Sequence, residues 1–205
     1  MGKRSFFPRL ALVNLVRNSR YYGPYLLSCG ALAAMYYILR FLTWNEVIQT
    51  VRGAAYLQVM MSIGCFVVAL FSTVLLLYAN SFVMKRRQKE LGLYNILGLE
   101  KRHIAALCFW ETLLCAAVVI PGGIAAGILL SKLILLMLLK LVQIPVQFGF
   151  SVSVRGVGET AALLGVLFLL ALLWNLLCLG RSRPIELLHS DSAGAVSYTH
   201  LTLPT

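Results

Sequence analysis

Charged side chains are few in this chain, and acidic ones are the scarcest. Only 12% of the 205 residues are charged, with 7 Asp and Glu against 18 Lys and Arg. Asp191 is the only aspartate and lies outside every apolar run, which excludes the paired intramembrane aspartates of a membrane protease. The three histidines form no HExxH pattern, so a zinc hydrolase is also excluded. We therefore do not expect an enzyme.

Paired cysteines and a phosphate-binding loop are missing as well. The five cysteines lie inside apolar runs and none forms a CxxC pair, so they are predicted to be packing residues. No GxxxxGK[ST] loop occurs, and GGIAAG lies within an apolar run instead of following a strand. We expect no cofactor and no metal in this chain.

Hydrophobic residues are what the chain has in excess, at 60% with a mean hydropathy of +0.85. This composition predicts an all-α integral membrane protein. Four apolar segments exceed the roughly 20 residues that a helix needs to cross a bilayer. They are residues 22–42, 57–83, 104–141 and 157–179. The net charge of +11 comes from Lys and Arg at the ends of these runs, where lipid and topology explain it, so no nucleic acid is expected.

The third run, residues 104–141, allows two interpretations. As one helix it would be about 57 Å long, nearly twice the apolar thickness of a bilayer. Pro121-Gly122-Gly123 could mark a turn between two spans or a kink within one. Basic residues precede the first span and follow the second and the fourth, and the positive-inside rule places all three groups in the cytoplasm. An even number of crossings follows, so we predict four spans with the third long and kinked.

The segments outside the spans are short. Residues 1–20 are predicted to be cytoplasmic, either as an interfacial helix or as a disordered basic tag. Residues 189–195 would form a truncated cytoplasmic tail. Residues 196–205, VSYTHLTLPT, break the composition and match the translation of a sequencing-library adapter. We expect these ten residues to be an artefact, with the natural reading frame continuing after about Ala195.

Glu111 is the one carboxylate well inside an apolar run. Such a group is a candidate proton site, but its shallow depth favours a role in helix packing. Asn80 and Asn175 lie at depths that would let them hydrogen-bond Glu111. We predict helix packing for these three polar residues, not proton transport.

Residues 84–103, MKRRQKELGLYNILGLEKRH, form a basic amphipathic segment between the second and third spans. Such a segment can dock an apolar stripe into a groove of a soluble partner. It can equally lie on an anionic membrane surface. The residue pattern alone does not separate these alternatives.

This segment, together with Glu111, GGIAAGILLSK and RSRPIELL, resembles the FtsX-like ABC transporter permease family. More narrowly, residues 7–188 resemble the N-terminal half of bacitracin-resistance (BceB-type) permeases, with residues 21–188 as the four-span block. The resemblance implies a permease in the bacterial cell membrane with its N-terminus in the cytoplasm. It implies a separate cytoplasmic ABC ATPase dimer that binds ATP and Mg, the remaining half of the permease, and in some members a sensor histidine kinase.

What the resemblance implies for mechanism is mechanotransmission: ATP-driven motion is conveyed through the long helices to an extracellular task, here resistance to peptide antibiotics. The short segment between the first two spans favours this branch over permeases of the FtsX or lipoprotein-release type. A membrane scaffold without an ATPase is the third alternative. By match to the family, the residues that contact the ATPase would be Arg86, Arg87, Lys89, Glu90, Leu91, Leu93, Tyr94, Leu97 and Gly98.

The small residues that follow Pro121 allow another helix to approach closely. They include Gly122, Gly123 and Gly127. In a lone helix they could equally provide flexibility. The resemblance favours packing, and we expect the second span or an equivalent helix of the other half as the partner.

Overall fold

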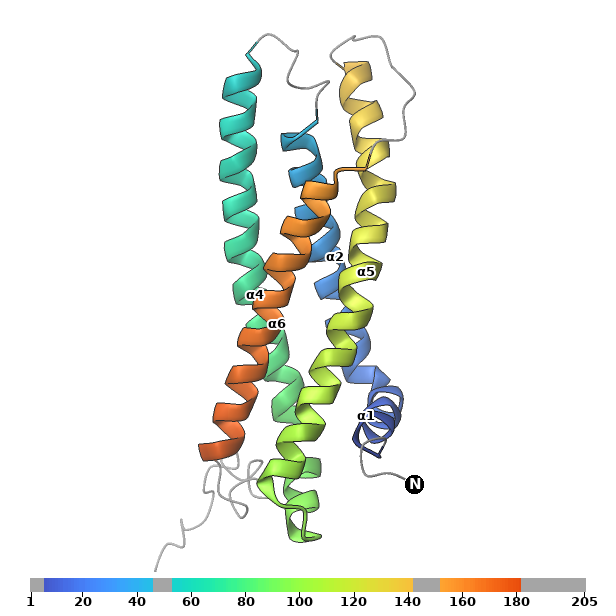
Figure 1. Cartoon of the computed structure of the whole chain (residues 1–205), viewed down its shortest axis with the longest axis vertical. Helices are drawn as coiled ribbons and strands as arrows, with labels where there is room; N and C mark the ends of the chain where they lie inside the picture. Colours follow the sequence, from blue (N-terminus) through green and yellow to red (C-terminus); the bar gives the residue numbers. More distant parts are fainter. Residues whose placement is uncertain (1–5, 46–52, 142–151, 182–205) are drawn as a thin grey trace, which may run out of the picture.

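A computed structural model describes residues 6–45, 53–141 and 152–181, and this part of the chain is helical apart from short turns (Figure 1). The helices are α1 (Phe6–Arg17), α2 (Ser19–Thr43), α4 (Ala54–Ile96), α5 (Lys101–Leu141) and α6 (Val154–Arg181). Four helices are long and apolar enough to cross a membrane, over Ser19–Thr43, Ala54–Gln88, Lys101–Leu141 and Val154–Gly180. The predicted all-α membrane fold with four spans is confirmed. Residues 189–195 and 196–205 lie outside the described residues.

The long third run is one helix. α5 continues for 41 residues through Pro121, Gly122 and Gly123, so the alternative of a hairpin at this tripeptide is wrong. The bend that a proline produces inside a helix stays a prediction at Pro121. Of the two alternatives for residues 1–20, the structure has a helix over Phe6–Arg17.

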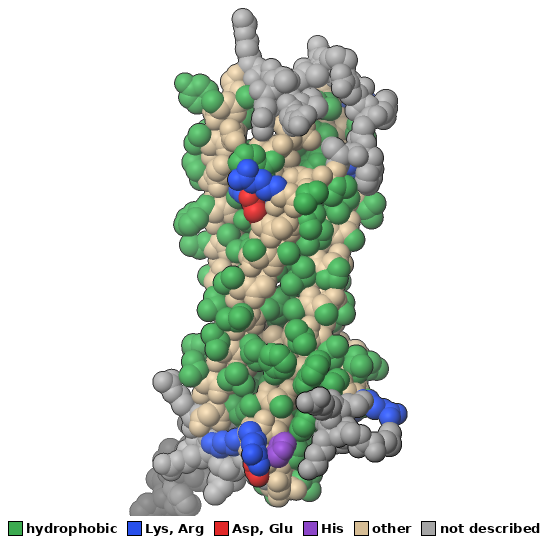
Figure 2. Space-filling model, viewed as in Figure 1, with side chains coloured by type: hydrophobic (Ala, Val, Ile, Leu, Met, Phe, Trp, Pro, Cys, Tyr) green, Lys and Arg blue, Asp and Glu red, His purple; other side chains and the backbone are tan. Residues whose placement is uncertain are grey.

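The four long helices form a bundle whose two ends differ (Figure 1). One end holds α1, the turn between α4 and α5, and the last turn of α6, and we call it the α1 end. The opposite end holds the last turn of α2 and the first turn of α6. Figure 2 shows a broad hydrophobic belt between charged groups near the two ends. The described chain enters and leaves at the same end, as an even number of crossings requires.

Helix α2 lies at the centre and packs against α5, α4 and α6. The largest buried cluster includes Cys29 of α2, Leu76 of α4, Cys115 of α5 and Leu164 of α6. Cys29, Cys65, Cys108 and Cys115 are buried, and Cys178 is half-buried. Their predicted role as small apolar packing residues agrees with these positions.

The small residues of α5 bring it close to α2. A Cβ added at Gly123 would clash with Cβ of Ala33, and one at Gly127 would lie 3.0 Å from Cδ1 of Tyr37. Close contact was correctly predicted, but the expected partner was wrong: these glycines face the first span, α2, and not the second. At Gly122 an added Cβ meets nothing within 4 Å, so this residue is not part of the contact.

Candidate functional site

The turn between α4 and α5 has a defined geometry. Gly98 has a φ of 91°, a left-handed value that residues with a Cβ adopt only at a cost. The backbone N–H of Leu99 donates to the carbonyl of Tyr94 at 3.0 Å, and this 6→1 bond identifies a Schellman motif. Tyr94 and Leu99 pack in one apolar cluster, as the motif requires. The motif ends α4 and holds α5 close to it.

Residues 84–103 therefore do not form a separate helix between two spans. α4 is a continuous helix of 43 residues that carries the second span directly into this segment. By the helical rise it is about 65 Å long, roughly twice the apolar thickness of a bilayer. The α1 end of α4 must extend beyond the hydrocarbon, and it carries the turn with it.

The predicted ATPase-contacting residues differ in how exposed they are in the structure. Arg86, Leu93, Leu97 and Gly98 are exposed, with Leu93 at 51% and Leu97 at 70% of their full accessibility. Glu90 and Tyr94 are half-buried, and the side chain of Lys89 lies outside what the structure describes. Arg87 and Leu91 are buried, at 3% and 1%, so they cannot form a contact surface. For these two residues the prediction of direct contact is wrong.

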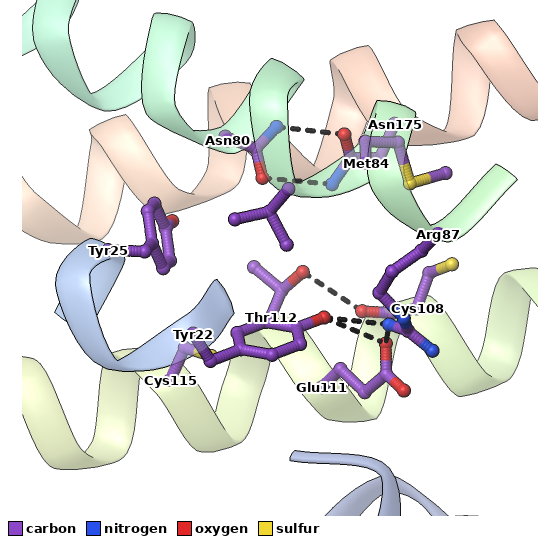
Figure 3. A pocket seen from close by; sticks show the side chains of 11 residues that line it. Tyr22, Tyr25, Asn80, Met84, Arg87, Cys108, Glu111, Thr112, Cys115 and Asn175 are labelled. Carbon is purple, nitrogen blue, oxygen red and sulfur yellow. Dashed lines mark hydrogen bonds and ion pairs between the residues drawn. The ribbon is translucent and has the colours of Figure 1, made fainter. Parts of the chain in front are cut away.

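Arg87 instead forms a buried ion pair with Glu111. Its Nη1 contacts Oε2 of Glu111 and also donates to the Tyr22 hydroxyl at 2.7 Å. Tyr22 in turn donates to the same carboxylate oxygen at 3.5 Å. Figure 3 shows the three side chains pointing toward one another from α4, α5 and α2. The guanidinium also lies 5.7 Å from the centre of the Tyr22 ring.

Helix α1 is tied into the same network through its asparagines. Asn14, which is buried, donates to Oε1 of Glu111 at 3.3 Å. Asn18, the residue between α1 and α2, donates to both carboxylate oxygens of Glu90 at 3.2 and 3.0 Å. Glu90 lies 3.5 Å from Nε of Arg87. One charged network thus joins four helices just inside the α1 end.

Such a network fixes the relative positions of the helices. Removing one partner of a buried ion pair costs about 3–5 kcal/mol, because a charge is left without compensation. Replacing both partners with apolar groups is often neutral, so the pair contributes little net stability. What it supplies is position: α4 and α5 cannot slide past each other at this level without breaking it.

Glu111 was correctly expected to pack against other helices, but its expected partners were wrong. Asn80 and Asn175 bond to each other, with amide-to-carbonyl distances of 2.8 and 3.1 Å in the two directions. This reciprocal pair joins α4 to α6 and lies beside the ion pair in Figure 3. Sequence reasoning missed Asn14 and Tyr22, and it assigned Arg87 to the surface.

The space enclosed here is small. A cavity of about 30 Å³ lies among Tyr25, Asn80, Arg87 and Thr112. That volume accommodates a water molecule, whereas pockets for organic ligands measure roughly 300–1,000 Å³. In the described residues no group of three or more His, Cys, Asp and Glu side chains could hold a metal ion. The site is suited to holding helices together and not to binding a substrate.

A second charged group lies at the opposite end, and sequence reasoning missed most of it. Arg40 of α2 pairs with Glu159 of α6, and Arg155 reaches the same carboxylate at 3.1 Å. The Arg155 guanidinium lies 3.7 Å from the centre of the Trp44 ring. The sequence does contain a signal for this pair: Arg40 lies near the end of the first apolar run and Glu159 near the start of the fourth. Opposite charges at these two boundaries could have suggested the ion pair.

Comparisons with known proteins identify the family to which this chain is similar. Residues 62–184 match the family described as FtsX-like permease C-terminal. The bacitracin export permease protein BceB of Bacillus subtilis is 30% identical over 171 residues, 82% of this chain and 26% of that protein. BceB of Halalkalibacterium halodurans is 28% identical over 188 residues, 90% of this chain and 28% of its own.

The ABC transporter permease YvcS of Bacillus subtilis is 25% identical over 181 residues, which are 87% of this chain and 28% of that protein. The chain thus spans about a quarter of the length of the curated relatives it matches. Residues 62–184, the region that matches the permease family, contain the α4–α5 turn, the ion pair of Arg87 and Glu111, and the asparagine pair.

Proposed function

Because the chain belongs to the FtsX-like permease family, as an ABC transporter permease of the BceB type, we propose that it couples a separate cytoplasmic ATPase to an extracellular task. The task we propose is resistance to, or sensing of, peptide antibiotics, by analogy with the bacitracin export permeases. ATP and Mg would be bound by the partner ATPase. The remaining half of the permease and a sensor histidine kinase are further proposed partners.

We place the α1 end in the cytoplasm. Exposed Arg9, Arg17, Lys85, Arg86 and Arg102 all lie near that end, and positive charge is concentrated on the cytoplasmic side of membrane proteins. This orientation puts the α4–α5 turn within reach of a cytoplasmic ATPase.

The observation that carries the proposal is the exposed apolar turn at the end of two long, joined helices. Leu93, Ile96 and Leu97 are all more than half exposed, at 51%, 59% and 70%. Because α4 extends beyond the bilayer, they face water unless a partner covers them, and clustered exposed leucines mark an interaction site. A partner that moves this turn would move α4 and α5 together, since the Arg87–Glu111 pair joins them.

The test is co-purification of the full-length permease with an ABC ATPase encoded beside its gene. We expect the double variant Leu93→Glu/Leu97→Glu to lose at least about 30-fold in affinity, as loss of a central apolar anchor does. The matched control is Val16→Glu, an equally exposed apolar residue at the same end but on α1. Retention of the ATPase by the double variant would refute the coupling proposal and favour a membrane scaffold.

The nature of the task needs a separate readout. Cells that express the intact transporter should tolerate a higher concentration of a cell-wall-directed peptide antibiotic than cells with the double variant. If ATPase binding is lost but tolerance to every such peptide is unchanged, the antibiotic role is wrong and a permease of the lipoprotein-release type becomes the better proposal.

A further inference from the structure

An open groove of about 350 Å³ runs between α2 and α4 near the α1 end. From α2 it is lined by Arg20, Tyr21, Pro24, Tyr25 and Ser28. From α4 it is lined by Tyr78, Ala79, Phe82 and Val83. It lies on the outside of the bundle, where the acyl chains and headgroups of the membrane are the surrounding solvent, and it is separate from the small cavity beside Glu111.

Two residues that line the groove on facing helices, Ser28 and Ala79, have small side chains. Ser28 donates its hydroxyl to the carbonyl of Pro24 at 2.7 Å, so this side chain is satisfied along its own helix and does not fill the space. Ala79 on the facing helix has only a methyl group. Most of the other lining side chains are aromatic or aliphatic.

One cation, Arg20, lines the groove, and a second, Arg86, lies beside the groove wall at Phe82. Arg20 is exposed, and it is the second residue of α2. Arg86 is exposed, and its guanidinium lies 5.3 Å from the centre of the Phe82 ring in the groove wall. No carboxylate is among the described residues that line the groove. The nearby Glu90 and Glu111 are already engaged by Asn18, Asn14 and Arg87, so the positive charge of Arg20 and Arg86 is not neutralised locally.

From this arrangement we propose that the groove is a binding site for an anionic phospholipid of the leaflet at the α1 end. The phosphate would lie between Arg20 and Arg86, because guanidinium groups bind phosphate oxygens in pairs. Tyr21, next to Arg20, would lie at the level where ring and hydroxyl meet the headgroups. Tyr78, about 12 Å from Arg86 along α4, would line the path of the acyl chain. An acyl chain would follow the apolar walls past Pro24 and Ala79. Basic pockets between membrane helices bind anionic headgroups in this way.

This site does not depend on the proposed ATPase coupling. It would nevertheless join α2 to α4 from the lipid side, near the level where the hydrogen bond from Arg87 to Tyr22 joins them from inside. Lipid charge in one leaflet would thus influence how firmly α4 is held.

The test uses the purified full-length protein in detergent with equal amounts of phosphatidylglycerol and phosphatidylcholine that have the same acyl chains. Native mass spectrometry measures the ratio of the two lipid adducts. We expect a preference for phosphatidylglycerol that falls roughly 25-fold in Arg20→Gln/Arg86→Gln, as two headgroup-level cations are removed. The matched control, Arg9→Gln/Arg17→Gln, removes two exposed arginines of α1 outside the groove and should keep the preference.

A second pair of variants tests the apolar part of the groove. Ala79→Trp fills it and should reduce the binding of both lipids, whereas Val74→Trp, at an exposed apolar position outside the groove, should not. An equal loss of preference in both arginine double variants, or no preference in the unaltered protein, would overturn the proposal. Displacement of the lipid by millimolar glycerol phosphate would also overturn it, because a free phosphate would then suffice.

Discussion

Arg87 and Arg86 are neighbours in the sequence with opposite environments, and this contrast allows a sharp test of the buried network. Arg87 is 3% exposed and pairs with Glu111, whereas Arg86 is exposed and stacks on Phe82. Arg87→Met removes the buried cation with little change in volume. It leaves the Glu111 carboxylate buried, with only the hydrogen bonds from Asn14 and Tyr22.

We expect Arg87→Met to lower the free energy of unfolding by about 3–5 kcal/mol, the cost of leaving one member of a buried pair uncompensated. In a chain of this size each kcal/mol lowers Tm by roughly 2–4 °C, so the expected decrease is about 6–20 °C. The assay is thermal unfolding of the detergent-solubilised protein followed by tryptophan fluorescence. Arg86→Met, the matched control, should change the free energy by no more than about 0.5 kcal/mol.

The double variant Arg87→Met/Glu111→Gln completes the cycle. Glutamine carries no charge to compensate, so most of the lost stability should return. Its single carbonyl oxygen can accept from Asn14 at the Oε1 position, and its amide nitrogen at the Oε2 position can donate to the Tyr22 hydroxyl. A double variant as unstable as the sum of the two single variants, or an Arg87→Met decrease no larger than that of Arg86→Met, would refute the assignment of this pair.

Three further predictions concern single positions. Gly127→Val should lower the free energy of unfolding by about 1–3 kcal/mol, because the new Cβ would lie 3.0 Å from Tyr37. Gly122→Ala, where the added Cβ meets open space, should raise it by up to about 1 kcal/mol, and thermal unfolding measures both changes. Gly98→Ala should destabilise the α4–α5 turn by about 1–2 kcal/mol, because alanine adopts the left-handed φ of this position only at a cost. Limited proteolysis near the turn should therefore be faster in Gly98→Ala and unchanged in Gly98→Asn, since asparagine tolerates this φ. Glu159→Gln should lower Tm by only a few degrees, since its ion pairs are partly exposed, and a loss as large as that of Arg87→Met would contradict this.

The four spans were predictable because each is a long apolar run bounded by charge, and nothing in a bilayer competes with a helix for such a run. The single continuous α5 was predictable from charge alone. Both predictions use the hydropathy or the charge of a whole segment, and these sums change little when a predicted helix boundary is wrong by several residues.

Segment sums could not identify Arg87 as the partner of Glu111, because the residue of α4 that lies level with Glu111 depends on where α4 ends. Ending the second span at Val83 placed Arg87 outside the membrane and made Asn80 the nearest polar residue. With α4 continuing to Ile96, Arg87 lies nine residues before its end, and Glu111 lies ten residues after the start of α5 at Lys101. The two residues are therefore at the same height in an antiparallel pair, and Asn80, two turns farther away, is not.

Asn14 was missed for a related reason. Its contact with Glu111 depends on the angle between α1 and α2, which meet at Asn18. No residue pattern specifies that angle. The choice of α2 over α4 as the partner of Gly123 and Gly127 likewise depends on how the helices are rotated, which a stripe of small residues does not determine.

The position of the Arg87–Glu111 pair along its helices has a mechanical consequence. It lies about 14 Å from the α4–α5 turn and about 50 Å from Ala54, the start of α4 at the opposite end, by the helical rise. A rigid rod pivoting at this pair has a short arm at the turn and a long arm beyond it. A displacement of the turn would therefore reach the far end of α4 reversed in direction and enlarged between three- and fourfold, so the helix would act as a lever whose gain is set by the place of one salt bridge.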